Sequence, residues 1–195
     1  MAARLQPELG VPILVENKFG AGARIGTEYV ARAPNDGYTF LIMASTHTIL
    51  PSMVVNLPYD AIRDFAPVSL IVDSPFVLAV HPSVPAQTAQ EFVALARAKP
   101  GSIEYGTSGV GSPFHLAGEL LKMTAGVEML HVPYKGTGPL MAALLAGEVQ
   151  AGLVPLGPYL PYFRSGKLRP LAIADKQRTS LLPDLPTIAE AVPLP

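Results

Sequence analysis

The stretch IEYGTSGVGSPFHLAGELLKMT, residues 103–124, carries the clearest structural signal in the chain. It begins with a short β-rich run, passes through a glycine-rich turn at 106–111 and continues as an apolar-patterned helix to Thr124. Ser112 is a favourable N-cap and Pro113 a favourable first helical residue. Gly126 follows, where a left-handed residue commonly ends a helix. The stretch therefore predicts a strand joined to a helix by a tight glycine turn.

The order of strand, glycine turn and helix recurs at least four times along the chain, which is typical of an α/β protein with a parallel sheet. Residues 44–48 are expected to form a polar loop and 51–58 an irregular segment. The other elements share short apolar runs bounded by proline or glycine. Strands are expected at 12–16, 38–43, 67–72, 76–81, 103–105, 129–132, 149–154 and 168–174, and helices at 2–9, 23–33, 88–98, 112–124, 139–146, 157–164 and 187–191.

Composition excludes several classes of protein. Hydrophobic residues make up 49% of the 195 residues and charged residues 15%, which excludes an intrinsically disordered chain. The 14 basic and 15 acidic residues give a net charge of −1, which lacks the basic footprint of a nucleic-acid-binding protein. The absence of cysteine excludes disulfides and cysteine nucleophiles. No apolar run approaches the roughly 18 residues of a membrane helix, and the first residues lack an apolar signal core, so the chain as given carries no export signal.

Three expected strand-to-helix junctions combine glycines with a good cap, hydroxyls or a cation, at residues 20–22, 106–112 and 134–138. Ligands of open α/β sheets bind beyond the carboxyl ends of the strands. A helix N-terminus there presents free backbone N–H groups and the positive end of a dipole, and a carboxylate is the simplest ligand for it. Lys135 is the cation inside such a loop. The alternative is that the glycines only serve tight turns and that Lys135 is an exposed turn residue.

A serine hydrolase is the alternative from another class, with Ser108 or Ser112 acting beside His115. The segment GTSG at 106–109 misses the G-x-S-x-G spacing of such enzymes, and a structural role at the helix start is the simpler reading of His115. The segment GAGARIG at 20–26 misses the dinucleotide spacing by one residue. The four histidines are too dispersed for a zinc pattern, so neither a cofactor nor a metal is expected.

Seven segments occur in a fixed order: DGYT (36–39), LPYD (57–60), DFAPV (64–68), HLAGEL (115–120), HVPYKG (131–136), GKLRPLA (166–172) and LPDLPT (182–187). Together they resemble the Bug-type substrate-binding proteins of the tripartite tricarboxylate transporters. The resemblance covers almost the whole chain, and the ordered set is far more specific than any single motif.

The resemblance implies a two-lobed, type II periplasmic binding protein fold built from three-layer α/β/α lobes. The first lobe would comprise residues 1–73 plus 173–195, and the second lobe residues 74–172. Family members usually begin with an export signal, a first strand and a glycine-rich loop, and end with a part that completes the first lobe. The resemblance therefore implies a chain truncated at both ends, with an incomplete first lobe.

The resemblance also implies a periplasmic, non-enzymatic receptor without a cofactor. It would capture a small carboxylate (a di- or tricarboxylate, an aromatic acid or an amino acid) and deliver it to a membrane permease. Asn17, Gly20 and Gly22 would line the first lobe, and Val154 stands where many members carry an acidic or amide residue. Carried over by position, the ligand contacts fall on Ser45, Thr46, Thr107, Ser108, Gly109, Val110, Ser112, Tyr134, Lys135 and Gly136. A sensor or adaptor role is an alternative, and a sheet edge exposed by a missing strand would favour a homodimer.

Overall fold

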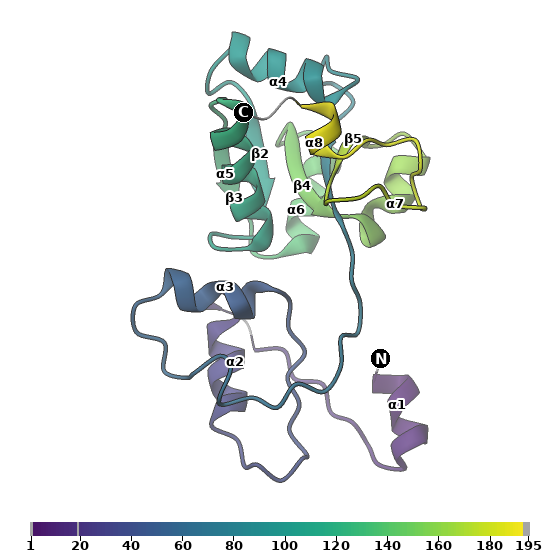
Figure 1. Ribbon diagram of the computed structural model, residues 1–195. Helices are drawn as coiled ribbons and strands as arrows, with labels where there is room; N and C mark the ends of the chain where they lie inside the picture. The colour runs from purple at the N-terminus through teal and green to yellow at the C-terminus, as the bar shows by residue number, and fades with distance from the viewer. Residues whose placement is uncertain (1, 19, 193–195) are drawn as a thin grey trace. The chain divides into compact units, whose positions relative to one another are not determined.

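The computed structural model describes residues 2–18 and 20–192 (Figure 1). The chain divides into two compact units, Met1–Ala66 and Pro67–Pro195. The second unit contains a five-stranded sheet in the order β3-β2-β4-β1-β5. Its strands are β1 (Phe76–Val80), β2 (Glu104–Thr107), β3 (Leu130–Pro133), β4 (Ala151–Pro155) and β5 (Arg169–Ala174).

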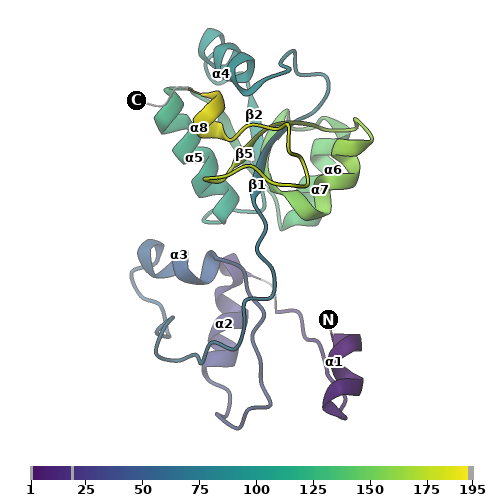
Figure 2. The same cartoon turned by 45° about the vertical axis from the view of Figure 1, so that its right-hand side comes forward.

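Helices cover both faces of this sheet because its strands carry apolar side chains on both sides. In β1, Leu78 and Val80 belong to one core, while Val77 and Ala79 belong to the other. The first core includes residues of α4 (Ala89–Ala98), α5 (Pro113–Ala125) and α8 (Ile188–Ala191), and the second includes residues of α6 (Thr137–Ala146) and α7 (Leu156–Arg164). Figure 2 shows α5 and α8 on one side of the sheet and α6 and α7 on the other. The second unit is thus a three-layer α/β/α structure.

Strand direction decides where the helices begin. β2 pairs in parallel with β3 and β4, as the alternation of strand and helix predicted. β1 departs from that expectation, since it pairs antiparallel with both β4 and β5. Because β2, β3 and β4 run in the same direction, their carboxyl ends lie at one edge of the sheet. The helices α5, α6 and α7 begin at that edge.

Local capping signals place the helices of the second unit close to where the sequence predicted them. The Thr88 hydroxyl accepts a hydrogen bond from the Glu91 amide at 3.1 Å, and Thr187 forms a full capping box with Glu190. Ser112 caps α5, and Gly126 ends it in the left-handed conformation. These side chains satisfy backbone groups that would otherwise have no partner at the helix ends.

The first unit consists of short helices: α1 (Ala2–Leu9), the 3₁₀ turn η1 (Ala21–Ala23), α2 (Arg24–Ala31) and α3 (Thr46–Met53). The prediction of a polar loop was wrong for residues 46–48, and that of an irregular segment was wrong for residues 51–53, because α3 forms there. His47 and Leu50 give α3 a buried side. The His47 ring packs edge-on against the Phe65 ring, with the ring centroids 4.8 Å apart. Burial of this face stabilises the helix. Its first three residues are polar, so the sequence pattern did not predict it.

Three predicted strands, 12–16, 38–43 and 67–72, do not form in the described residues. Their apolar side chains are exposed instead; Leu14 is 83% exposed, Ile42 69% and Leu70 81%. A strand requires a neighbour for its backbone N–H and C=O groups. In the described part of the chain these three segments have no such neighbour. An apolar run alone was therefore insufficient to predict a strand.

The structure also differs from the predicted division into lobes. Residues after 173 were expected to return to the first lobe, but those described pack within the second unit. The Ile173 amide donates to the Pro186 carbonyl at 2.8 Å, and Ala191 and Val192 are buried in the core that contains α4. Residues 173–192 therefore pack within the second unit, where Ile173 belongs to one core and Ala191 and Val192 to the other.

Within the described residues, no helix is long and apolar enough to cross a membrane.

Candidate functional site

Two loops lie side by side at the edge of the sheet where the parallel strands end. The first follows β2 and leads into α5; the second follows β3 and leads into α6. The Tyr134 amide donates to the Thr107 carbonyl at 2.9 Å, and the Gly136 amide donates to the Ser108 carbonyl at 3.2 Å. These bonds extend the pairing of β2 with β3 into the loops. The structure thus brings together the predicted residues of the Thr107–Ser112 and Tyr134–Gly136 segments.

Glycine conformations give both loops their shape. Gly109 has a φ of 135° and Gly136 a φ of 106°, values that side-chain-bearing residues rarely adopt. Gly136 is also the N-cap of α6, where it has no side chain to occupy the helix terminus. The backbone of the two loops therefore carries no side chain at these two positions.

Backbone N–H groups without an acceptor gather at this edge. Among the described residues, the amides of Ser108, Val110 and Phe114 have no protein acceptor at the start of α5. The amides of Thr137 and Gly138 are likewise without one at the start of α6. Unpaired amides at two neighbouring helix N-termini favour an anion, because the helix dipoles add positive potential. A carboxylate has the charge and the acceptor oxygens that such a site lacks.

Two polar side chains add to these amides. The Ser112 hydroxyl oxygen accepts from the His115 amide at 3.2 Å, and its O–H can still donate to a ligand. Lys135 is exposed in the second loop and forms no ion pair with another described residue. Its charge increases the attraction of this edge for a carboxylate.

Two histidines support the first loop from the protein side. His131 Nε2 lies 2.7 Å from the Thr107 hydroxyl oxygen, which in turn accepts from the Gly109 amide at 3.3 Å. Nδ1 of His115 accepts from the Gly111 amide at 3.2 Å. The two imidazole rings stack with their centroids 4.2 Å apart. Thr107 itself is fully buried, so its hydroxyl contributes to the loop's structure.

The groups behind the histidines have shifted pKa values. Burial, together with the nearby His115, lowers the pKa of His131. Burial and the hydrogen bond to Glu119 raise the pKa of Tyr105 well above its usual value. Burial opposes ionisation of Glu119, but hydrogen bonds from Tyr105 and Lys122 outweigh it and leave the pKa of that carboxyl below its ordinary value. Glu119 and Lys122 form an ion pair at 2.9 Å. The described residues contain no cluster of side chains that could hold a metal ion.

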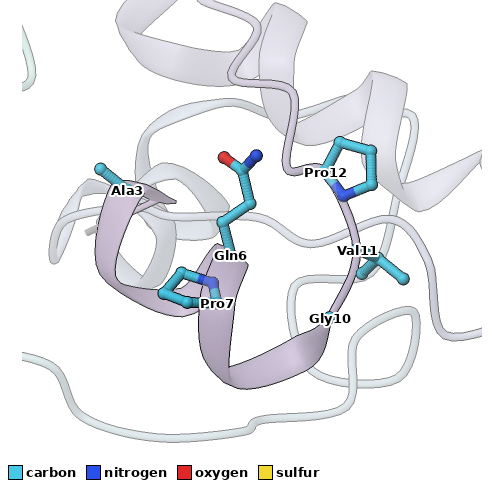
Figure 3. Close-up of a pocket in the computed structure, with 6 residues that line it drawn as sticks. All are labelled: Ala3, Gln6, Pro7, Gly10, Val11 and Pro12. Carbon is cyan, nitrogen blue, oxygen red and sulfur yellow. The ribbon is translucent and has the colours of Figure 1, made fainter.

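The other predicted contacts lie elsewhere. Val154 is fully buried in the core beneath α6 and α7, so its side chain is inaccessible to a ligand. In the first unit, Asn17, Gly20, Gly22 and Ser45 are exposed, and Thr46 is half-buried at the first turn of α3. The first unit also has an open hollow beside α1 (Figure 3). Ala3, Gln6, Pro7, Gly10, Val11 and Pro12 line it, none of them charged, so it does not suit an anion.

The geometry does not favour the hydrolase alternative. A serine nucleophile requires a hydrogen bond from its hydroxyl to a basic imidazole nitrogen. Nδ1 of His115 is the nitrogen with the lone pair, and it is already occupied by the Gly111 amide. Among the described residues, neither Ser108 nor Ser112 donates a hydrogen bond to an imidazole.

Sequence reasoning placed Gly111, Thr137 and Gly138 in the predicted junctions without naming them as individual contacts, and it gave His131 no role. His131 belongs to the HVPYKG segment, but the segment does not say which residue it contacts. Only the parallel pairing of β2 with β3, which sets Tyr105 opposite His131, brings it beside the first loop. The amides of Thr137 and Gly138 could have been found from the glycine that precedes them, since glycine at an N-cap leaves the first turn uncapped.

The comparison with protein families decides the identity. Residues 1–193 match TctC, the tripartite tricarboxylate transporter family receptor. The chain belongs to this family. BugT of Bordetella pertussis is 36% identical over 192 residues, which cover 97% of this chain and 59% of BugT. The chain therefore spans about three fifths of the length of the curated relatives it matches.

Solved structures agree with the family assignment. An R. palustris structure with adipate matches with a TM-score of 0.92 and 38% identity over 98% of this chain and 65% of that one. MatC from Rhodopseudomonas palustris with bound malate matches with a TM-score of 0.88 and 31% identity over 97% of this chain and 65% of that one. TctC relatives are periplasmic binding proteins rather than enzymes, as the resemblance predicted. The fold is that of periplasmic binding proteins.

Proposed function

We propose that this TctC-family chain is part of a receptor that binds a small carboxylate, with the Thr107–Ser112 and Tyr134–Gly136 loops holding one carboxylate group. The observation that best supports this proposal is the set of unpaired backbone amides at the starts of α5 and α6. Each helix start places positive potential at the same edge of the sheet. The exposed Lys135 and the free O–H of Ser112 complement the same charge.

A dicarboxylate is the ligand class best supported. The relatives solved with adipate and with malate are both bound to dicarboxylic acids. In the first unit, Ser45, Thr46, Asn17, Gly20 and Gly22 stay predicted ligand contacts, as the family resemblance implies. The two loops of the second unit offer amides for one carboxylate, so a second carboxylate requires other groups.

We further propose that the receptor acts outside the cytoplasm and delivers its ligand to a tripartite transporter permease. Support comes from the family description and from the periplasmic relatives. A homodimer through an exposed sheet edge stays a prediction; β3 and β5 are the edge strands of the described sheet.

Isothermal calorimetry of the chain with acetate, malate, adipate and citrate tests this function. We expect saturable binding of at least one dicarboxylate, tighter than that of acetate, and no turnover of the acid. At a concentration 100 times its dissociation constant, such a ligand also stabilises the protein by about 2.7 kcal/mol.

Thr137→Pro is the sharpest variant for this test. Thr137 is the first helical residue of α6, a position where proline is tolerated while its amide N–H is lost. We expect weaker dicarboxylate binding with unchanged helix content. Thr137→Ala is the matched control, because it keeps the N–H and should bind like the parent chain. Equal binding by the proline variant would contradict the role of these amides.

A further inference from the structure

His115 and His131 form a stacked pair directly behind the Thr107–Ser112 loop. His115 lies in the first turn of α5, and His131 lies on β3. Each imidazole is hydrogen-bonded to a different point of the loop. The pair therefore connects the loop to both the helix that follows it and the neighbouring strand.

The bond between Gly111 and His115 fixes the protonation state of His115. A backbone N–H can only donate, so Nδ1 of His115 must carry its lone pair and the ring proton must sit on Nε2. An imidazolium has donors on both nitrogens and could not accept this bond. Protonation of His115 would therefore release the Gly111 amide.

His131 holds the other half of the loop through Thr107. Its Nε2 is 2.7 Å from the Thr107 hydroxyl, whose oxygen accepts from the Gly109 amide. Because Thr107 is fully buried, this chain of hydrogen bonds is shielded from water. Gly109 and Gly111 flank Val110, whose amide is one of the unpaired donors. The two histidines thus fix the backbone on both sides of a proposed ligand contact.

The charged groups that face the pair are Glu119 and Lys122 on α5, with the Tyr105 hydroxyl on β2. Glu119 is ion-paired with Lys122 at 2.9 Å and accepts a hydrogen bond from Tyr105. The pKa of Glu119 lies below its ordinary value and that of Tyr105 above it, so both keep their charge state near neutral pH.

We propose that His115 and His131 are positioning residues whose neutral imidazoles hold the Thr107–Ser112 loop in the shape that receives a carboxylate, and that protonation of His115 releases the loop. The ligand part of this inference rests on the proposed function, whereas the loop geometry does not. A second protonation is opposed by the first, since the two rings are stacked at 4.2 Å.

The first test needs no ligand. Nitrogen NMR of the histidine rings should show the Nε2–H tautomer for His115 at about pH 7.5. On acidification to about pH 5, the Gly111 amide resonance should change together with protonation of His115. The Nδ1–H tautomer for His115, or a Gly111 amide that ignores its titration, would overturn the inference.

The second test compares adipate binding by the parent chain, His115→Ala and His115→Asn over the same pH range, with circular dichroism confirming that each is folded. The asparagine oxygen can replace Nδ1 as the acceptor and does not titrate. We expect His115→Ala to bind about tenfold more weakly near neutral pH, the factor for one lost hydrogen bond. The asparagine variant should bind within about twofold of the parent and without pH dependence. The parent should weaken toward the alanine variant as the pH falls.

Full binding by His115→Ala, or pH dependence that persists in His115→Asn, would overturn the positioning role while leaving the receptor function intact. Absence of adipate, malate and citrate binding to the parent chain at every pH would contradict the proposed function instead. The tautomer and Gly111 measurements then decide the positioning inference by themselves.

Discussion

At the scale of the residue, Gly118 shows how tightly α5 packs on β2. A Cβ at this position would overlap the buried Tyr105 ring, with Cδ2 and Cζ both 3.1 Å away and Cε2 closer still. The Tyr105 ring also packs against the His131 ring, with the ring centroids 5.1 Å apart, and its hydroxyl donates a hydrogen bond to Glu119. The ring has little freedom to move, so glycine is required here by space.

We expect Gly118→Ala to lower the free energy of unfolding by about 1–3 kcal/mol, the usual cost of overpacking a core. Urea denaturation followed by circular dichroism measures it. Gly157→Ala is the matched control, because Gly157 also lies in a helix and a Cβ there meets no atom within 4 Å. The control should be neutral or stabilising. Equal destabilisation of both variants would contradict the packing argument.

His131 gives a pH-dependent stability. Burial lowers its pKa in the folded state, so below the usual imidazole value of about 6.5 the unfolded chain binds more protons. Stability is therefore full above about pH 6.5 and falls as the pH drops toward the folded-state pKa. Denaturation between about pH 5 and 7.5 should show this slope, and His131→Gln should flatten it. If the free energy of unfolding of His131→Gln depends on pH as steeply as that of the parent chain, other groups cause the pH dependence.

The histidine pair could not be predicted from the sequence, although both residues lie in segments that indicated the family. His115 and His131 are separated by the rest of α5 and the turn before β3, and only the parallel register brings them together. The free amides were partly predictable. Glycine turns followed by helix starts indicated the right edge of the sheet, because that relation is local and follows from chain direction.

At the scale of the element, α5 shows how far local signals determine a helix. Ser112, Pro113 and Gly126 predicted its ends to within about a residue, and the structure confirms the cap at each. The predictions of strands at 38–43 and 67–72 were wrong because strand formation depends on a partner elsewhere in the chain. Local patterns thus predicted the helix ends well and the sheet membership of apolar runs poorly.

Ser112→Ala should weaken the start of α5. The Ser112 oxygen satisfies the His115 amide at 3.2 Å, and loss of such a cap costs about 0.5–2 kcal/mol. Chemical denaturation measures the change, and Ser112→Asp should restore much of the stability, since aspartate is also a strong N-cap. If Ser112→Ala is as stable as the parent chain, the Ser112 cap does not stabilise α5.

Hydrogen exchange distinguishes the strands of the sheet from the apolar segments that were predicted as strands but do not pair within the described residues. Amides of β1, which has neighbours on both sides, should be strongly protected, whereas amides of residues 38–43 should exchange rapidly. The two segments are similarly apolar, so hydrophobicity alone predicts no difference. Equal protection would mean that residues 38–43 find a partner in solution, as in a dimer.

At the scale of the whole molecule, the chain combines one well-packed three-layer unit with a first unit that exposes many apolar side chains. Val55 is 97% exposed and Ile62 84%, whereas β1 of the second unit is almost fully buried. Exposed apolar surface of this kind usually belongs to an interface. The chain matches about three fifths of the length of its relatives. The proposed carboxylate site consists of loops of the second unit, so this unit is where the site can be tested most directly.

Amide NMR of the chain titrated with adipate tests whether a carboxylate binds at the starts of α5 and α6. We expect the largest chemical-shift changes at the amides of Ser108, Val110, Phe114, Thr137 and Gly138. These changes should saturate together and be absent with a neutral diamide of the same length. Shifts confined to other segments, such as the hollow beside α1, or no shifts at millimolar adipate, would contradict a carboxylate site at the starts of α5 and α6.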